Sequence, residues 1–279
     1  MIARAEFVSI ARLEFAEFLR SRWIVFCLLV YAVLTGVFVL VGLRESTVIG
    51  FTGMGRVLLS FSHVLVFLLP LLGLGATAQI VNGARDDGTL ELLFAHPLSR
   101  QGWFASISIV RFVALLVPLV ILLPVMAVIG SGAFGQVIPW GYLGRVLLVS
   151  TSLLYCSVAF GLAVSTFVRN QAKALMLMLL VWAVQVALID FGLVGLMLQW
   201  RMPPEAVFAI AALNPVQDAR LALLFAADPE LATLGPVGFF LVHRLGHAAL
   251  FAIGIAWPVI LGTTAWFLSV RRFHRGDLV

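Results

Sequence analysis

Long, nearly unbroken runs of apolar residues dominate the chain, and short polar segments separate them. A helix that crosses a bilayer needs about 20 mostly apolar residues. The runs do not alternate apolar and polar positions, as the strands of a membrane β-barrel do, so the pattern predicts an all-α, polytopic membrane protein. Six runs are long enough to be transmembrane helices, at residues 23–43, 57–81, 104–130, 143–168, 174–198 and 247–270.

The segment before the first run, residues 1–22, has the pattern of an amphipathic helix. At 100° per residue, Phe7, Ala11, Phe15 and Phe18 share one face, and Glu6, Ser9, Glu17 and Arg20 lie opposite. We expect this helix to lie in the membrane interface, in contact with lipid. A simple basic flank before the first span is the alternative.

The longest segment between two runs covers residues 199–246. Its four proline-containing turn signals enclose apolar stretches that are too short to span a membrane. We expect short helices that re-enter the membrane from the outer side, before the last span.

Composition supports one membrane domain over residues 1–279. The chain is 62% hydrophobic and only 11% charged, whereas a soluble domain is roughly a quarter charged. This excludes a soluble enzyme, a disordered chain and a disulfide scaffold. Cys27 and Cys156 each lie inside an apolar run, without a metal-binding spacing, so we expect both to be packing residues.

The positive charges predict the orientation of the chain. Of 18 Lys and Arg residues, twelve lie in one set of loops and six in the other. Cytoplasmic loops carry the excess, so both termini should be cytoplasmic, which six spans allow. The net charge of +5 therefore reflects topology, and no nucleic acid partner is expected.

The loop at residues 84–100 combines acids with apolar residues. Asp87 is placed to cap a short helix that Pro97 would end. Leu90, Leu93 and Phe94 would share an exposed face of that helix. Such a face needs a partner to cover it.

This loop resembles that of permeases of the type-two exporter family of ABC transporters. The matching residues are Asp87-Gly88-Thr89-Leu90-Glu91-Leu92-Leu93 and Pro97-Leu98-Ser99-Arg100. The resemblance implies a coupling helix seated on a dimer of cytoplasmic ATPase subunits, with ATP and magnesium bound there and no cofactor in this chain. It also implies a second copy of the chain and a bacterial inner (cytoplasmic) membrane location. The implied contact residues are Asp86, Asp87, Gly88, Thr89, Leu90, Glu91, Leu93, Phe94 and Pro97.

Within that family, the sequence is similar to the permeases of nitrous-oxide-reductase maturation. The similarity lies in the size, in residues 214–220 and in the basic tail at 271–278. It implies a periplasmic partner protein and a role in copper-site assembly.

The chain cannot itself be the ATPase. A P-loop needs a lysine that follows glycine and precedes Ser or Thr. The single lysine, Lys173, lies between two alanines. With Arg169 it is a candidate for a second ATPase contact, and a topology-setting basic turn is the alternative.

Two other sets of residues are candidates for chemistry. Gln185 and Asp190 in the fifth span are candidates for cargo or partner contact, with an interfacial carboxylate as the alternative for Asp190. His243 and His247, spaced i and i+4, are a weak candidate for a metal site. We therefore expect no metal.

Other function classes fit less well. A stand-alone secondary transporter or channel would show internal repeats or several mid-membrane charges. An intramembrane enzyme would show a catalytic motif. The sequence shows neither. A membrane anchor that passes mechanical work to an outer partner without moving cargo stays open.

Overall fold

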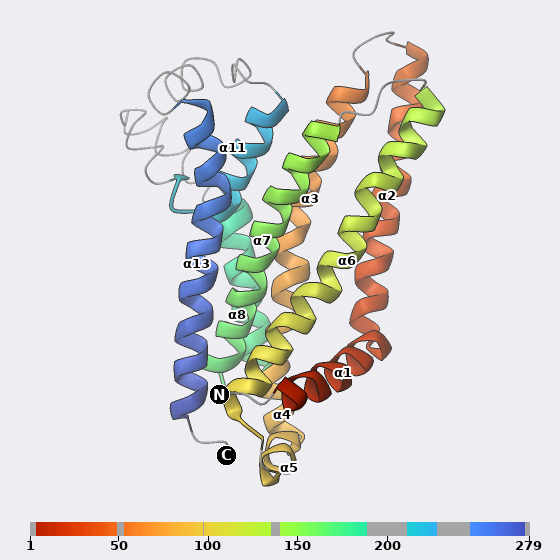
Figure 1. Cartoon of the computed structure of the whole chain (residues 1–279). Helices are drawn as coiled ribbons and strands as arrows, with labels where there is room; N and C mark the ends of the chain where they lie inside the picture. The colour runs from red at the N-terminus through yellow and green to blue at the C-terminus, as the bar shows by residue number, and fades with distance from the viewer. Residues whose placement is uncertain are drawn as a thin grey trace.

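The computed structural model describes residues 4–48, 53–96, 98–134, 140–188, 211–227 and 246–276. All the elements assigned in these ranges are helices, in agreement with the predicted all-α fold (Figure 1). They are α1 Arg4–Arg20, α2 Arg22–Val48, α3 Gly53–Thr77, α4 Ile80–Asp86, α5 Thr89–Ala95, α6 Arg100–Phe134, α7 Trp140–Phe167, α8 Gln171–Ala183, the π-helix η1 Val184–Leu188, α11 Pro215–Ala227 and α13 His247–Arg275.

Four helical segments in the described ranges are long and apolar enough to cross a membrane. They are Ser62–Asp86, Arg100–Ile129, Trp140–Phe167 and Ala248–Arg275. Where the first and fifth spans were predicted, the structure has α2, Arg22–Val48, and α8 followed by the π-helix, Gln171–Leu188. The parts of these helices whose side chains are described include the apolar segments Arg22–Leu34 and Gln171–Ala187. The six-span count therefore stays a prediction. So does the re-entrant region at residues 199–246, of which residues 211–227, with α11, and residue 246 are described.

Helix α7 lies at the centre of the bundle and packs against α3, α6, α11 and α13. Glycine allows the close approach of α3 and α7, because a Cβ at Gly73 would lie 2.8 Å from Cβ of Ser157. The hydroxyl of Thr77 adds a hydrogen bond across this contact, donating to the carbonyl oxygen of Val158 at 3.1 Å. These contacts fix the two helices that carry the loops described below.

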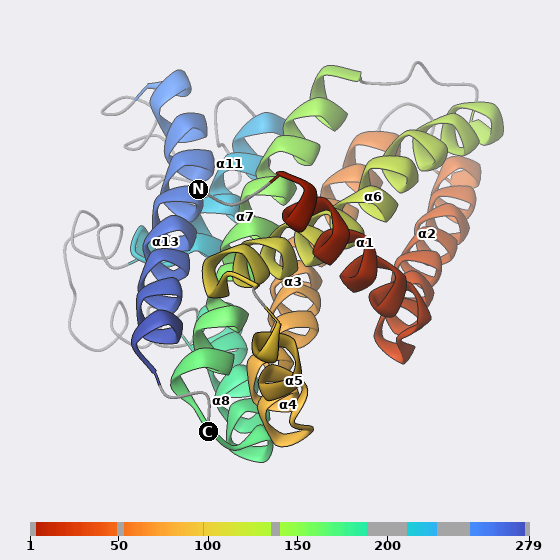
Figure 2. The same ribbon diagram turned by 60° about the horizontal axis from the view of Figure 1, so that its bottom comes forward.

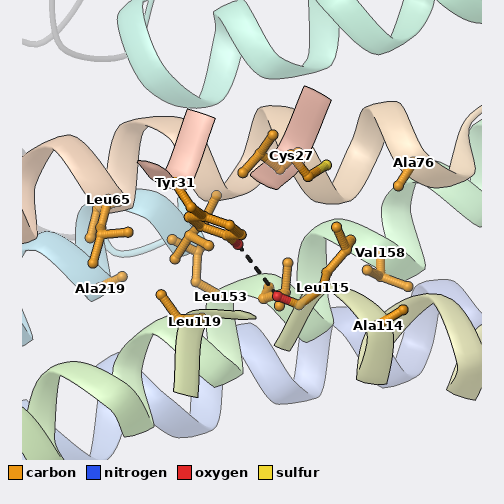
Figure 3. Close-up of a cluster of buried hydrophobic side chains, with 14 of the residues drawn as sticks. Cys27, Tyr31, Leu65, Ala76, Ala114, Leu115, Leu119, Leu153, Val158 and Ala219 are labelled. Atoms are coloured by element: carbon orange, nitrogen blue, oxygen red, sulfur yellow. Dashed lines mark hydrogen bonds between the residues drawn. The ribbon is translucent and has the colours of Figure 1, made fainter. Parts of the chain in front are cut away.

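The apolar core joins α2, α3, α6 and α7 (Figure 3). Leu65, Leu115 and Leu153 are almost completely buried in it. The Tyr31 hydroxyl, from α2, donates to the carbonyl oxygen of Leu115 at 3.5 Å. Cys27 and Cys156 are buried and free, as expected of packing residues.

Helix α1 crosses α6 at the end of the bundle that also holds α4 and α5 (Figure 2). Its buried stripe is Ile10, Glu14 and Phe18, whereas Phe15 is 41% exposed. Of the predicted apolar face, Phe18 is therefore packed inside the molecule, whereas Phe15 stays exposed, as lipid contact would require. The buried stripe also includes an acid, Glu14. Burial raises the pKa of Glu14, while the nearby charge of Arg111 lowers it. The Arg111 guanidinium also lies 4.3 Å from the centre of the Phe18 ring, so two buried side chains of α1, Glu14 and Phe18, meet this cation of α6.

Candidate functional site

The helix predicted between Asp87 and Pro97 is α5, and a further short helix, α4, precedes it across a turn at Gly88. Gly88 has a φ of +70°, in the left-handed region that favours glycine. Asp87 ends α4, and its N–H donates to the carbonyl oxygen of Gly83 at 2.9 Å. The expectation that Asp87 caps α5 is therefore wrong. Gly88 occupies that position and has no side chain to form a cap.

The apolar face predicted for α5 is turned toward the bundle. Leu90 is fully buried, and Leu93 and Phe94 are half-buried, so the expectation that they are exposed is wrong. The Phe94 ring lies 6.0 Å from the Trp103 ring on α6, centre to centre. Leu92, which spacing did not single out, is 72% exposed. The inward face holds α5 in place, and Leu92 becomes its exposed apolar contact.

The polar residues predicted for this surface are mostly accessible. Asp86, Asp87, Thr89 and Glu91 are exposed, and Gly88 is partly buried. The accessible surface of α5 therefore combines negative charge with Leu92. Pro97 lies outside the described residues.

The structure brings the loop at residues 168–173 beside α4. The Ser165 hydroxyl, at the end of α7, accepts the backbone N–H of Val81 at 2.8 Å. The side chain of Asn170 caps α8 by accepting the N–H of Lys173 at 3.1 Å. Arg169 and Lys173 are both exposed. The two predicted contact regions thus form one continuous end of the bundle.

The C-terminal end of α13 is attached to the same assembly. The Arg100 guanidinium, at the start of α6, donates to the carbonyl oxygens of His274 at 3.4 Å and Gly276 at 3.2 Å. Phe273 stacks on Trp103, with ring centres 5.4 Å apart. A displacement of α5 would therefore be transmitted to α6 and α13.

A buried polar group lies at the opposite end of the bundle, where α11 meets the π-helix (Figure 1). Gln185, a predicted candidate, is only 8% exposed. Its backbone carbonyl accepts a hydrogen bond from the Asn214 side chain. π-Helices are often found at functional sites. Asp190 lies outside the described residues. We call Gln185, Asn214, Gln217 and Asp218 the α11 cluster.

Asn214, Gln217 and Asp218 were not among the candidates predicted from the sequence, and Asp218 is the ionisable one. Asp218 is 3% exposed, and its Oδ2 atom has no hydrogen-bond partner among the described residues. Burial raises its pKa from 3.8 to about 7. Asp218 lies four residues before the buried Ala222, so the two share one face of α11. The sequence does not show that other helices cover this face.

Metal binding has little support in the described part of the chain. It contains no group of three or more His, Cys, Asp or Glu residues able to hold a metal ion. His243 lies outside the described residues. His247 begins α13, but its side chain is also outside the description.

Comparison with known proteins identifies relatives over nearly the whole chain. A profile of the family described as "ABC-2 family transporter protein" matches residues 8–278. The "Probable ABC transporter permease protein NosY" of Stutzerimonas stutzeri is 28% identical over 270 residues, covering 95% of this chain and 98% of the relative. The protein of the same name from Pseudomonas aeruginosa is 29% identical over 238 residues, covering 80% and 83%.

Proposed function

The chain belongs to the ABC-2 transporter family as a membrane permease subunit without an ATPase domain, and from this premise we propose that α4 and α5 are its coupling element. A partner ATPase subunit is implied by the family. In our proposal that subunit docks on α5, binds ATP and magnesium, and drives movement of the permease helices. The loop at residues 168–173, with Arg169 and Lys173, forms the second contact.

The observation that carries this proposal is the two-sided character of α5. Its inner side, with Leu90 and Phe94, is packed against the bundle. Its outer side presents Leu92 and the acid Glu91 to solvent. An exposed large apolar residue beside a charge suits a protein contact better than a membrane surface, because the cytoplasmic leaflet is itself negative.

The proposal also includes the parts of the topology that sequence alone predicts. Two copies of the chain form the transmembrane unit, each with six spans and with both termini in the cytoplasm of a bacterial cell. The α11 end then faces the periplasm. There Gln185 and Asp190 are candidates for contact with cargo or with a periplasmic partner protein.

We further propose that the complex serves copper-site assembly in nitrous-oxide reductase. The support is the name of both relatives and the similarity of residues 214–220. Of these, Asn214 and Asp218 prove to be buried at the α11 end. Export of a cargo and mechanical work on a periplasmic partner are both compatible with this role.

A charge reversal tests the coupling element. The ATPase subunit is first identified by pull-down of the tagged chain and mass spectrometry. Glu91→Lys should then lower its recovery about tenfold, as expected for loss of a charged contact at an interface. The matched control is Glu17→Lys, because Glu17 is an exposed acid on α1 at the same end of the bundle. This variant should not change recovery.

Equal recovery of the ATPase subunit with the wild type and Glu91→Lys would contradict the proposal. Recovery of no ATPase with the wild-type chain would favour a stand-alone transporter.

A deletion strain tests the pathway. Loss of the gene should give nitrous-oxide reductase that lacks copper, measured by metal analysis of the purified enzyme. The wild-type gene should restore the copper content, and the Glu91→Lys gene should restore less. A fully copper-loaded enzyme in the deletion strain would exclude this role but not the permease assignment.

A further inference from the structure

A cavity of about 240 Å³ opens at the α5 end of the bundle, between three segments that are far apart in the sequence. Arg85 reaches it from α4, Arg169 from the loop between α7 and α8, and Arg272 from the last turn of α13. The apolar part of the wall comes from Phe167 and Phe273. The three cations therefore come together only in the folded chain.

The charges on this cavity are not balanced by its wall. The described lining contains three guanidinium groups and no carboxylate. Nε and Nη1 of Arg85 are buried, and no described residue accepts a hydrogen bond from them. Buried donors without acceptors are costly, and like charges around one cavity repel each other. Arg100 at the same end differs, since backbone carbonyls accept its hydrogen bonds. Among the lining residues that the structure describes, the cavity thus has no anion to accept hydrogen bonds, and Asp86, on the same helix as Arg85, is the nearby acid whose charge acts on it.

The position of the cavity indicates where that anion comes from. Three candidate membrane spans end around it, at Asp86, Phe167 and Arg275. This is the level at which lipid headgroups meet a transmembrane helix. Phe167 is 53% exposed beside the arginines, which provides an apolar surface for an acyl chain. Guanidinium groups match phosphate oxygens in charge and geometry.

We propose that this cavity binds the phosphate group of an anionic phospholipid, held by Arg85, Arg169 and Arg272. The ligand joins α4, the loop before α8 and the end of α13, so it stabilises the base on which α5 rests. Only the assignment of this lipid to the cytoplasmic leaflet rests on the proposed function. The accessible contact surface of α5, with Glu91 and Leu92, is separate from the cavity wall. Arg169 belongs both to this wall and to the loop proposed as the second ATPase contact, so the tests use Arg85 and Arg272.

Native mass spectrometry of the full chain in neutral detergent tests this site. Dimyristoyl phosphatidylglycerol is titrated against the wild type, Arg85→Gln and Arg272→Gln. Loss of one charge-assisted contact should lower the apparent affinity about tenfold in each variant. Arg271→Gln is the matched control, because Arg271 is the adjacent residue but lies over the Phe267 ring instead of the cavity. Its affinity should equal that of the wild type.

Two further arms identify the source of the phosphate. Zwitterionic dimyristoyl phosphatidylcholine should bind more weakly than phosphatidylglycerol. Its affinity should be the same for the wild type and for the two arginine variants. Inorganic phosphate at millimolar concentration should not displace phosphatidylglycerol from the wild type. Displacement would identify free phosphate as the ligand and overturn the lipid assignment.

The remaining outcomes count against the site itself. Equal phosphatidylglycerol affinity in the wild type, Arg85→Gln and Arg272→Gln would overturn it. Unchanged lipid affinity together with weaker recovery of the ATPase subunit would show that the cavity takes a carboxylate of that partner instead. Folding of each variant is checked by its thermal unfolding midpoint without added lipid. Failure of the Glu91→Lys pull-down leaves the lipid result intact, so the two proposals fail separately.

Discussion

Helix α5 and the α11 cluster lie toward opposite ends of the bundle, and they differ in what they bury (Figure 1). At α5 the buried side chains are apolar, such as Leu90, and the acids lie in solvent. In the α11 cluster the buried side chains are themselves polar, and one oxygen of Asp218 finds no hydrogen-bond donor in the described part of the chain. The first arrangement is that of a docking element with a stable base. The arrangement in the α11 cluster buries a carboxyl group whose charge state depends on its surroundings.

The largest effect should come from removing the charge of Asp218. Its folded pKa of about 7 exceeds its ordinary value of 3.8. The folded chain therefore holds the proton more tightly than the unfolded chain. Stability is fully present below about pH 4 and is lost as the pH rises through 7, by roughly 4 kcal/mol in total. Asp218→Asn stays neutral and should be nearly free of this loss between pH 4 and 8.

Thermal unfolding of both proteins in detergent across this pH range measures the difference. The Asp218→Asn curve should separate from the wild-type curve as the pH rises. Parallel curves would mean that Asp218 is charged in the fold, and the contrast between the two regions would disappear.

The next effect separates the two sides of α5. Leu90→Ala should cost about 3 kcal/mol of folding free energy, because it removes a fully buried side chain. Leu92→Ala, at a position 72% exposed, should cost less than about 0.5 kcal/mol and yet weaken recovery of the ATPase subunit. Unfolding midpoints and pull-downs on both variants make the comparison. A stability loss at Leu92 equal to that at Leu90 would contradict the two-sided account.

A smaller effect tests the packing that covers the α11 cluster. A Cβ at Gly254 of α13 would lie 2.9 Å from the carbonyl oxygen of Asp218 and would also meet the Ala222 side chain. Gly254→Ala should therefore cost about 2 kcal/mol through overpacking. Gly144→Ala is the control, since a Cβ there meets nothing within 4 Å and should be neutral or stabilising. Equal unfolding midpoints for the two variants would show that α11 shifts freely against α13.

The same contrast explains how far sequence could predict this molecule. The helical class and the loop at residues 84–100 followed from local apolar runs and one motif. Local spacing correctly grouped Leu90, Leu93 and Phe94 on one face of α5. It could not show that Trp103 and Phe273, from α6 and α13, cover that face. Periodicity groups residues on one face of a helix, but distant segments decide whether that face is covered. For this reason the sequence analysis expected the face of α5 to be exposed.

The burial of Asp218 and the burial of Glu14 were missed for a related reason. Glu14 is buried because Arg111 lies near it, and Asp218 is buried because α11 packs against α7 and α13. Sequence patterns place acids in solvent by default. An acid buried by a tertiary contact therefore contradicts the pattern. Such exceptions concentrate at functional or strained sites, which is why the α11 cluster is the better place to seek specificity.

The smallest predicted effect concerns the turn that aims α5. Gly88 has a φ of +70°, and a Cβ there would meet nothing within 4 Å. The cost of Gly88→Ala is thus purely that of the left-handed backbone, about 1 kcal/mol. Gly88→Asn should cost less, because asparagine adopts this conformation more readily. If the turn only joins two helices, both variants should keep full ATPase recovery. If it sets the direction of α5, recovery should fall in the order Gly88, Asn, Ala, although neither side chain touches the partner surface. If Gly88→Ala and Gly88→Asn had the same stability and the same ATPase recovery, the inner contacts of α5, and not the turn at Gly88, would position the docking surface.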